Sequence, residues 1–162
     1  MVNKALFSSK KSDWCTPKNI VDLVQQFRTI ELDPCSNPNS IVGALETYSL
    51  ENNQDGLALL WKSFNYVNPP YSKGKLIKWV AKAESEYVQN CVESIVLVPA
   101  RTDTKWFHKH CSQNTICFIK GRLKFLGAPS SAPFPSMLVY YGNDDANFEL
   151  HFCKLGKILT GV

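Results

Sequence analysis

The sequence predicts an α/β domain with a mostly parallel central sheet, helices on both faces, and an antiparallel C-terminal strand or hairpin. Three apolar segments that run into proline support this prediction, namely 29–33, 64–68 and 94–98. Proline lacks the N–H group that a β-ladder needs, so each of these strands must end where its proline begins. Segments of helical period separate the three strands, and this alternation is typical of parallel sheets.

Composition limits the classes of protein that the chain can belong to. Its 162 residues are 44% hydrophobic, which is enough for one domain with a sizeable core. The polar and basic segment 1–12 is expected to be a flexible arm, which leaves 13–162 as a single domain without a separate recognition domain. No apolar run approaches the roughly 20 residues that span a bilayer, so a cytoplasmic location is expected. The formal charge of +4 permits a polyanionic partner without requiring one.

The first ordered element is an amphipathic helix over 17–28. Thr16 is predicted to cap it and Pro17 to occupy its first position, because proline is tolerated there. Ile20, Val24 and Phe27 then recur at helical spacing.

A strand over 29–33 follows and ends at Asp33, before Pro34. A carboxylate at the carboxyl end of a parallel strand is well placed for the polar part of a ligand, because open α/β sheets bind ligands outside those ends. The chain continues through Cys35 and Ser36 without a glycine-rich loop, so side chains are expected to hold part of that ligand. Residues 43–61 are expected to form a short strand, a loop and a brief helical turn. Asp55 is there either part of an ordinary Asp-Gly turn or a ligand contact.

The central motif is the aromatic, apolar segment 64–71. Val67 and its neighbours suit a buried strand that stops at Asn68, and Pro69 and Pro70 fix the turn that follows. The Asn68 amide oxygen and the Pro69 carbonyl form a pair of hydrogen-bond acceptors, and Tyr71 adds a flat ring. A planar group that carries an NH2, such as a nucleobase with an exocyclic amine, fits this arrangement. The alternative is an ordinary proline-stopped turn with Tyr71 packed on the core.

The rest of the chain continues the α/β pattern. A helix follows Gly74. Lys73 and Lys75 flank its start, beside the central motif, where they are candidates for phosphate contacts or part of a solvated face. After the strand 94–99, Thr102 or Asp103 is predicted to cap a helix that opens at Lys105.

Three further segments complete the C-terminal half. Strands are expected at 115–119 and 137–141, and 148–159 should form a hairpin or strand. Basic and apolar residues alternate in 120–125, which predicts another strand with Arg122 and Lys124 on one face, as a phosphate track or as a charged edge strand. The loop 128–136 is long enough to suggest a function.

A zinc site is the metal alternative that the sequence raises. His108, His110, Cys111 and Cys117 are close in sequence, but the ligand pairs two to four residues apart that zinc sites use are missing. We therefore expect no metal.

The order of the motifs resembles a known family. Asn68-Pro69-Pro70-Tyr71 after an apolar strand is similar to the catalytic motif of amino-methyltransferases that use S-adenosylmethionine. The flanking segments resemble the small phage-type, Dam-like DNA N6-adenine methyltransferases, and the resemblance extends from Trp14 to about Tyr141. These segments are Trp14-Cys15-Thr16-Pro17, Asp33-Pro34-Cys35-Ser36, Arg101-Thr102-Asp103-Thr104 and Pro133-Phe134-Pro135-Ser136.

This resemblance implies a Rossmann-like domain that moves a methyl group from S-adenosylmethionine to adenine N6 in double-stranded DNA, without a metal. It implies a bacterial host cell, and a homodimer is compatible with it. The catalytic residues would be Asn68, Pro69, Pro70 and Tyr71. The methyl donor would contact Trp14, Thr16, Pro17, Asp33, Pro34, Cys35, Ser36, Asp55 and Asn68. The candidate DNA contacts are Lys73, Lys75, Arg101, Thr102, Asp103, Lys105, Arg122, Lys124 and Phe134.

Two alternatives to this function stay open. Enzymes with the Asn-Pro-Pro-Tyr motif also act on RNA or on protein amides, so the substrate could be one of these. A DNA-binding module could also keep the fold without catalysis. Titration with S-adenosylmethionine distinguishes a pure binding module from the enzymes, because the module should not bind the methyl donor.

Overall fold

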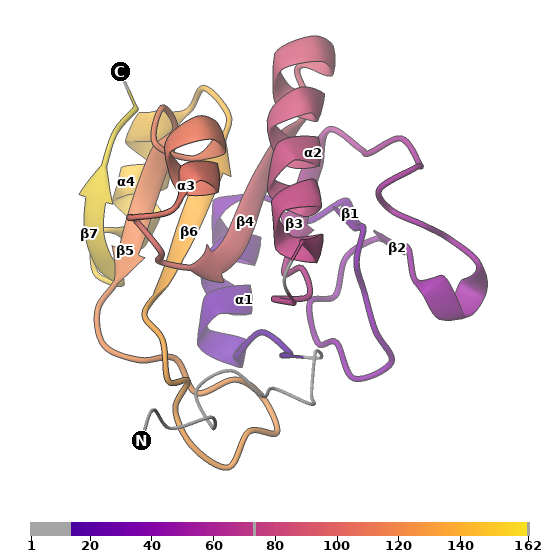
Figure 1. Cartoon of the computed structure of the whole chain (residues 1–162), viewed down its shortest axis with the longest axis horizontal. Helices are drawn as coiled ribbons and strands as arrows, with labels where there is room; N and C mark the ends of the chain where they lie inside the picture. Colours follow the sequence, from indigo (N-terminus) through magenta and orange to yellow (C-terminus); the bar gives the residue numbers. More distant parts are fainter. Residues whose placement is uncertain (1–13, 73, 162) are drawn as a thin grey trace.

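The computed structural model describes residues 14–72 and 74–161, and within them the chain forms one seven-stranded sheet with four α-helices (Figure 1). The expected arm 1–12 and Lys73 lie outside the described residues. In chain order the elements are α1 (Lys18–Phe27), β1 (Leu32–Asp33), β2 (Glu46–Thr47), the 3-10 turn η2 (Leu50–Asn52), β3 (Phe64–Val67), α2 (Lys75–Asn90), β4 (Glu93–Pro99), α3 (Lys105–His110), β5 (Thr115–Ile119), β6 (Ser136–Tyr141), α4 (Asp145–Phe152) and β7 (Gly156–Leu159).

The sheet has a parallel half and an antiparallel half. Its strand order is β2-β1-β3-β4-β6-β5-β7. The first four strands in this order pair in parallel, whereas β6 is antiparallel to both β4 and β5, and β7 is antiparallel to β5. The prediction of parallel pairing is thus confirmed for the three strands that end at proline, and the C-terminal half is more antiparallel than expected.

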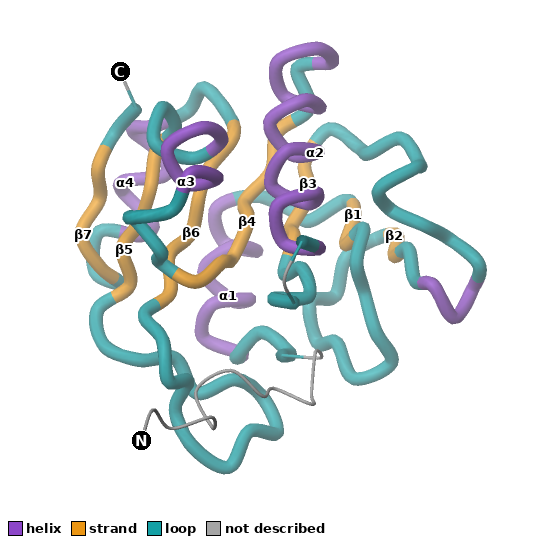
Figure 2. Tube along the Cα trace, in the orientation of Figure 1, coloured by secondary structure: helices purple, strands orange, loops and turns teal. Residues whose placement is uncertain are grey.

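Helices cover both faces of the sheet, as predicted. Figure 2 shows α2 and α3 in front of the strands and α1 and α4 behind them. The buried residues divide into two clusters that follow this arrangement, and β4 contributes to both. Ile95 and Leu97 pack with α1 and α4, while Val96 and Val98 pack with α2 and α3. This alternation follows from the two-residue period of a strand that is covered on both sides.

The prediction of a strand over 120–125 is wrong, because this segment is a loop between β5 and β6. Gly121 has φ of 79°, in the left-handed region, and the chain there leaves the line of β5. Leu123 and Phe125 are buried and Lys124 is exposed, so the alternation in the sequence reflects how a loop packs on the core. Leu126 forms the one β-bridge recorded outside the named strands of the described part, with Cys15.

The C-terminal prediction is half right. Residues Asp145–Phe152 form the helix α4 and only Gly156–Leu159 forms a strand, β7. Phe148 and Phe152 stand one helical turn apart, both fully buried, with ring centroids 4.5 Å apart. Such a pair suits a helix, because residues i and i+4 lie on the same helical face.

Two predicted helix caps are also corrected. The N-cap of α1 is Pro17, and the Thr16 hydroxyl instead shares a hydrogen bond of 3.0 Å with the Tyr66 hydroxyl. The N-cap of α3 is Thr104, whose hydroxyl donates to the Arg101 carbonyl at 2.7 Å, so neither Thr102 nor Asp103 has that position.

No helix in the described part of the chain is long and apolar enough to cross a membrane.

The packing of α4 gives the first prediction. Replacing Phe148 by Ala should lower the free energy of unfolding by about 3–5 kcal/mol, because it opens a cavity between α4 and the sheet. Leu150→Ala on the same helix is the control, since that side chain is 73% exposed and its loss should change stability by less than about 0.5 kcal/mol. Urea denaturation of both variants measures the difference, and equal losses would contradict the placement of α4.

Candidate functional site

The site lies where the order of the strands reverses. From β1 the chain moves outward to β2, then crosses back past β1 to β3 and continues to β4 on the other side. In open α/β sheets such a switch point leaves a crevice outside the carboxyl ends of the strands. Asp33 ends β1 and Asn68 follows β3, so the two residues that the sequence singled out meet at this crevice and line one small recess together.

A larger cavity of about 480 Å³ opens beside that recess. Its volume lies within the range of roughly 300–1,000 Å³ that small-molecule sites occupy. Six of the nine residues predicted to contact the methyl donor line it, namely Trp14, Pro34, Cys35, Ser36, Asp55 and Asn68. Thr16 and Asp33 lie in the small recess instead, and Pro17 lines neither.

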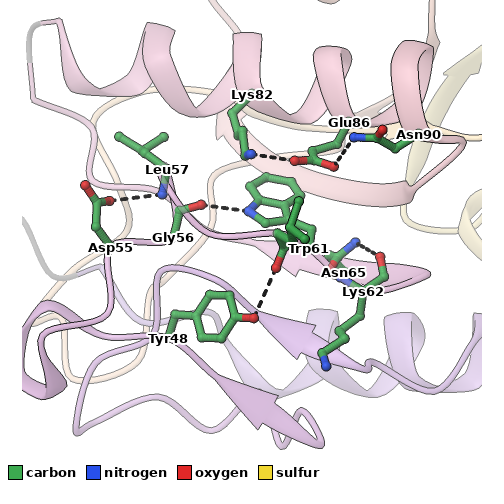
Figure 3. Close-up of polar contacts among 11 residues, drawn as sticks. Tyr48, Asp55, Gly56, Leu57, Trp61, Lys62, Asn65, Lys82, Glu86 and Asn90 are labelled. Atoms are coloured by element: carbon green, nitrogen blue, oxygen red, sulfur yellow. Dashed lines mark hydrogen bonds and ion pairs between the residues drawn. The ribbon is translucent and has the colours of Figure 1, made fainter.

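One wall of the cavity is the loop around Gly56, which is packed directly against the loop after β1. A Cβ atom at Gly56 would lie 1.9 Å from the Pro34 carbonyl oxygen, so any side chain would push the two loops apart. Figure 3 shows how this wall is anchored: the Trp61 indole N–H donates to the Gly56 carbonyl at 2.8 Å, and Asp55 accepts the Leu57 N–H at 3.0 Å. Asp55 is therefore both a turn residue and part of the cavity wall.

Sequence reasoning missed several residues of this cavity. They include Lys78 and Trp79 in the first turns of α2 and Glu51 in the segment that contains η2. Lys75, which was predicted to contact DNA, lines the same cavity. The cavity thus carries positive groups on α2 and carboxylates on the loop 51–55. Lys78 and Trp79 follow Lys75 by three and four residues, so they lie on the same face of the helix as Lys75. This spacing is the signal that could have identified them as neighbours of the central motif.

The Asp33 carboxyl group is buried and held by hydrogen bonds. Its Oδ1 accepts the Cys35 N–H at 3.3 Å and its Oδ2 accepts the Ser40 hydroxyl at 3.2 Å. Burial nevertheless raises its pKa from 3.8 to about 6, because the hydrogen bonds offset only part of the desolvation of the charged form. A ligand that donates a hydrogen bond or carries a positive charge would stabilise the ionised carboxylate.

The Asn68 amide is fixed at both ends. Its Nδ2 donates to the Trp14 carbonyl, and because a carbonyl can only accept, this contact determines which end of the amide is nitrogen. Its Oδ1 accepts the Tyr71 hydroxyl at 2.9 Å. The Tyr71 ring lies edge-on to Phe125 and Phe134, with centroids 6.1 and 5.7 Å away. Tyr71 therefore belongs both to the motif and to a packed aromatic group.

The segments predicted to contact DNA lie at the same edge of the sheet as Asn68. Segment 101–105 follows β4, and loop 120–135 follows β5, which runs in the same direction as β4 (Figure 1, orange loop below the arrowheads). Phe134 is half-buried, and its ring packs edge-on against that of Trp14, with the ring centroids 6.1 Å apart. The remaining described candidates are all exposed: Lys75, Arg101, Thr102, Asp103, Lys105, Arg122 and Lys124.

Three of the four candidate zinc ligands are engaged in polar contacts elsewhere. His110 Nδ1 lies 2.6 Å from Glu84 Oε2, the Cys111 thiol contacts the Tyr141 hydroxyl, and the Cys117 thiol contacts the Phe152 carbonyl. Among the residues described, no three His, Cys, Asp or Glu side chains come together as metal ligands would.

Comparison with known proteins identifies the family. The model of the family described as DNA N-6-adenine-methyltransferase (Dam) matches residues 4–139. The match covers most of the chain, and the chain belongs to this family. No curated protein and no solved structure matches the chain significantly.

The raised pKa of Asp33 predicts how stability depends on pH. Between pH 4 and pH 6 the unfolded chain loses the Asp33 proton before the folded protein does, so stability falls as pH rises. The shift of about two units corresponds to a loss of about 3 kcal/mol at pH 7. Asp33→Asn should therefore be more stable than the wild type at pH 7 and nearly equal to it at pH 4.

Chemical denaturation at both pH values tests this, with the exposed Asp103→Asn as the control. A wild type that gains stability relative to Asp33→Asn between pH 4 and pH 7 would contradict the burial of an uncompensated carboxyl group.

Proposed function

We propose that the protein methylates adenine N6 in double-stranded DNA and that Asn68 is the centre of the reaction. The observation that supports this most directly is the Asn68 amide, held in a fixed orientation at the rim of a ligand-sized cavity at the switch point of the sheet. The resemblance to phage-type enzymes suggests that it acts in the cytoplasm of a bacterial host, on its own or as a homodimer.

The cavity fits the chemistry of S-adenosylmethionine, which would supply an electrophilic methyl group. Lys75 and Lys78 suit its carboxylate, and the carboxylates of Glu51 and Asp55 suit its cationic groups or hydroxyls. The cavity is also lined by Trp79, whose flat ring suits the adenine of the methyl donor.

Asn68 would act by accepting hydrogen bonds from the amine that is methylated. The lone pair of an aromatic amine is delocalised into the ring, so the nitrogen is a poor nucleophile. If Asn68 Oδ1 and the Pro69 carbonyl accept its two hydrogens, the lone pair can turn toward the methyl group. Positive charge then grows on nitrogen in the transition state, and two fixed carbonyl dipoles stabilise that charge more than they stabilise the ground state. The main task of the protein is alignment.

The target base would have to leave the duplex, because its amine is not accessible within the stack. Trp14 and Tyr71 both hydrogen-bond to Asn68, and Phe134 packs against their rings. These three half-buried rings offer surfaces for an extruded base. Stacking of a base on an aromatic side chain contributes roughly 1–3 kcal/mol, which offsets part of the cost of extrusion.

Sequencing plasmid DNA from a host that lacks its own adenine methylation tests the proposal directly. Expression of the chain should produce N6-methyladenine within a recurring sequence context. Unmodified plasmid together with binding of S-adenosylmethionine in calorimetry would point to another substrate, and absence of binding would point to a non-catalytic DNA-binding module.

Removal of the central amide should separate catalysis from binding. Asn68→Ala is expected to lower the rate of methyl transfer by at least about 10²–10³-fold, because it removes a preorganised acceptor, while affinity for S-adenosylmethionine changes little. A tritiated-methyl assay and calorimetry measure the two quantities. The control is Asn143→Ala, an exposed asparagine between β6 and α4, at the opposite edge of the sheet. Full activity of Asn68→Ala would refute the assigned role.

The loop 120–135 should contribute to DNA affinity through charge. Arg122→Ala combined with Lys124→Ala is expected to weaken duplex binding and to reduce the salt dependence of the affinity by about two phosphate contacts. Fluorescence anisotropy over a range of salt concentrations measures both. Lys62→Ala combined with Lys109→Ala removes the same charge from the opposite edge of the sheet, before β3 and at the end of α3, and should leave the salt dependence unchanged. Equal effects of the two double variants would rule out this loop as a specific phosphate contact.

A further inference from the structure

The backbone of β4 has an open hydrogen-bond acceptor next to Asn68. The register of β3 and β4 pairs Phe64 with Glu93 and ends at Val67 with Val96, so one further step places Leu97 opposite Asn68. In a parallel ladder every second residue of a strand bonds to the same neighbouring strand: its N–H donates to the residue before its partner, and its C=O accepts the N–H of the residue after its partner. The Glu93 N–H donates to the Ser63 carbonyl, so Glu93, Ile95 and Leu97 are the residues of β4 that bond toward β3. The donor expected for the Leu97 carbonyl is therefore residue 69, which is a proline and has no N–H.

The Tyr71 hydroxyl takes the place of the missing backbone donor. Its oxygen lies 3.1 Å from the Leu97 carbonyl oxygen and 2.9 Å from Asn68 Oδ1, and its single hydrogen is shared between these two acceptors in a three-centre hydrogen bond. Leu97 is fully buried, so its carbonyl has no access to water and needs a donor from the protein. Burial raises the pKa of the Tyr71 phenol well above its ordinary value, so the hydroxyl keeps its proton and stays a donor at physiological pH.

The same hydroxyl completes a clamp on the Asn68 amide. Nδ2 is held by the Trp14 carbonyl, and Oδ1 is held by Tyr71. If the amide turned over, its oxygen would face the Trp14 carbonyl oxygen, and two acceptors would oppose each other. A carbonyl oxygen has two lone pairs, so the Tyr71 hydroxyl can use one and leave the other for an incoming amine.

We infer that the Tyr71 hydroxyl is a positioning group, distinct from any role of the Tyr71 ring in stacking on the base. Anchored to the Leu97 carbonyl that Pro69 leaves open, it fixes Asn68 Oδ1 in the orientation that accepts the substrate amine. This inference rests on the proposed function, because it assigns Asn68 as the acceptor.

Tyr71→Phe tests the inference, since it removes the hydroxyl and keeps the ring. The substrate is a duplex with the sequence context found methylated in plasmid DNA. At saturating enzyme and S-adenosylmethionine, the single-turnover rate of methyl transfer should fall on the order of tenfold, because Asn68 Oδ1 loses its alignment. The dissociation constant of the duplex should stay unchanged. A second duplex with 2-aminopurine at the target position should show the same fluorescence increase with both proteins, because base extrusion depends on the ring. Tyr71→Leu, which lacks the ring, should lose that increase.

An unchanged single-turnover rate of Tyr71→Phe would overturn the inference. So would a parallel loss of rate, duplex affinity and fluorescence increase, because the hydroxyl would then act in base binding. Absence of methyl transfer by the wild type would instead refute the proposed function.

The clamp itself can be tested in the free protein, without activity. In wild-type NMR spectra the side-chain amide of Asn68, assigned by its absence in Asn68→Ala, should exchange with water more slowly than that of exposed Asn143. Exchange of the Asn68 amide should accelerate in Tyr71→Phe. Equal exchange of the two amides in the wild type would overturn the inference whether or not Tyr71→Phe folds.

Discussion

The two prolines that end β3 are the constraint on which the rest of the site depends. Without N–H groups at positions 69 and 70, the ladder to β4 cannot continue, and the chain must leave the sheet at the switch point. Because Pro69 has no N–H, the Leu97 carbonyl on β4 lacks a backbone donor, and the Tyr71 hydroxyl donates to it instead. The end of β3 and the orientation of Asn68 thus follow from one local property of the sequence.

The site is assembled from segments that are far apart in the sequence, and each is fixed by a contact in the core. Trp14 reaches Asn68 through its carbonyl and packs on Phe134 through its ring. The loop at Gly56 lies against Pro34 and is tied to Trp61. These contacts shape a cavity without the glycine-rich loop that many nucleotide sites use, and they leave charged side chains on α2 and on the loop 51–55 to meet the ends of a ligand.

Residue patterns predicted the parallel half of the fold, because strand ends depend on local rules. Proline placed the end of β1 at Asp33 and the end of β3 just before Asn68. The resemblance to the family supplied six candidate donor contacts that line the cavity, but most of the other lining residues were not predicted. The errors occurred where tertiary packing overrides a local pattern. The alternation of 120–125 arises from a loop folded onto the core, and the Thr16 hydroxyl, a good capping group, is used instead by Tyr66. Trp61 and Trp79 meet only in three dimensions, with ring centroids 6.3 Å apart.

The most direct measurement of the central claim is a crystal structure with S-adenosylhomocysteine and a duplex that contains the target context. We expect the sulfur of the bound S-adenosylhomocysteine to lie in the cavity beside Asn68. We also expect an extruded adenine whose N6 is within hydrogen-bond distance of Asn68 Oδ1. A cosubstrate bound at the opposite edge of the sheet, or an adenine whose amine faces away from Asn68, would contradict the central claim.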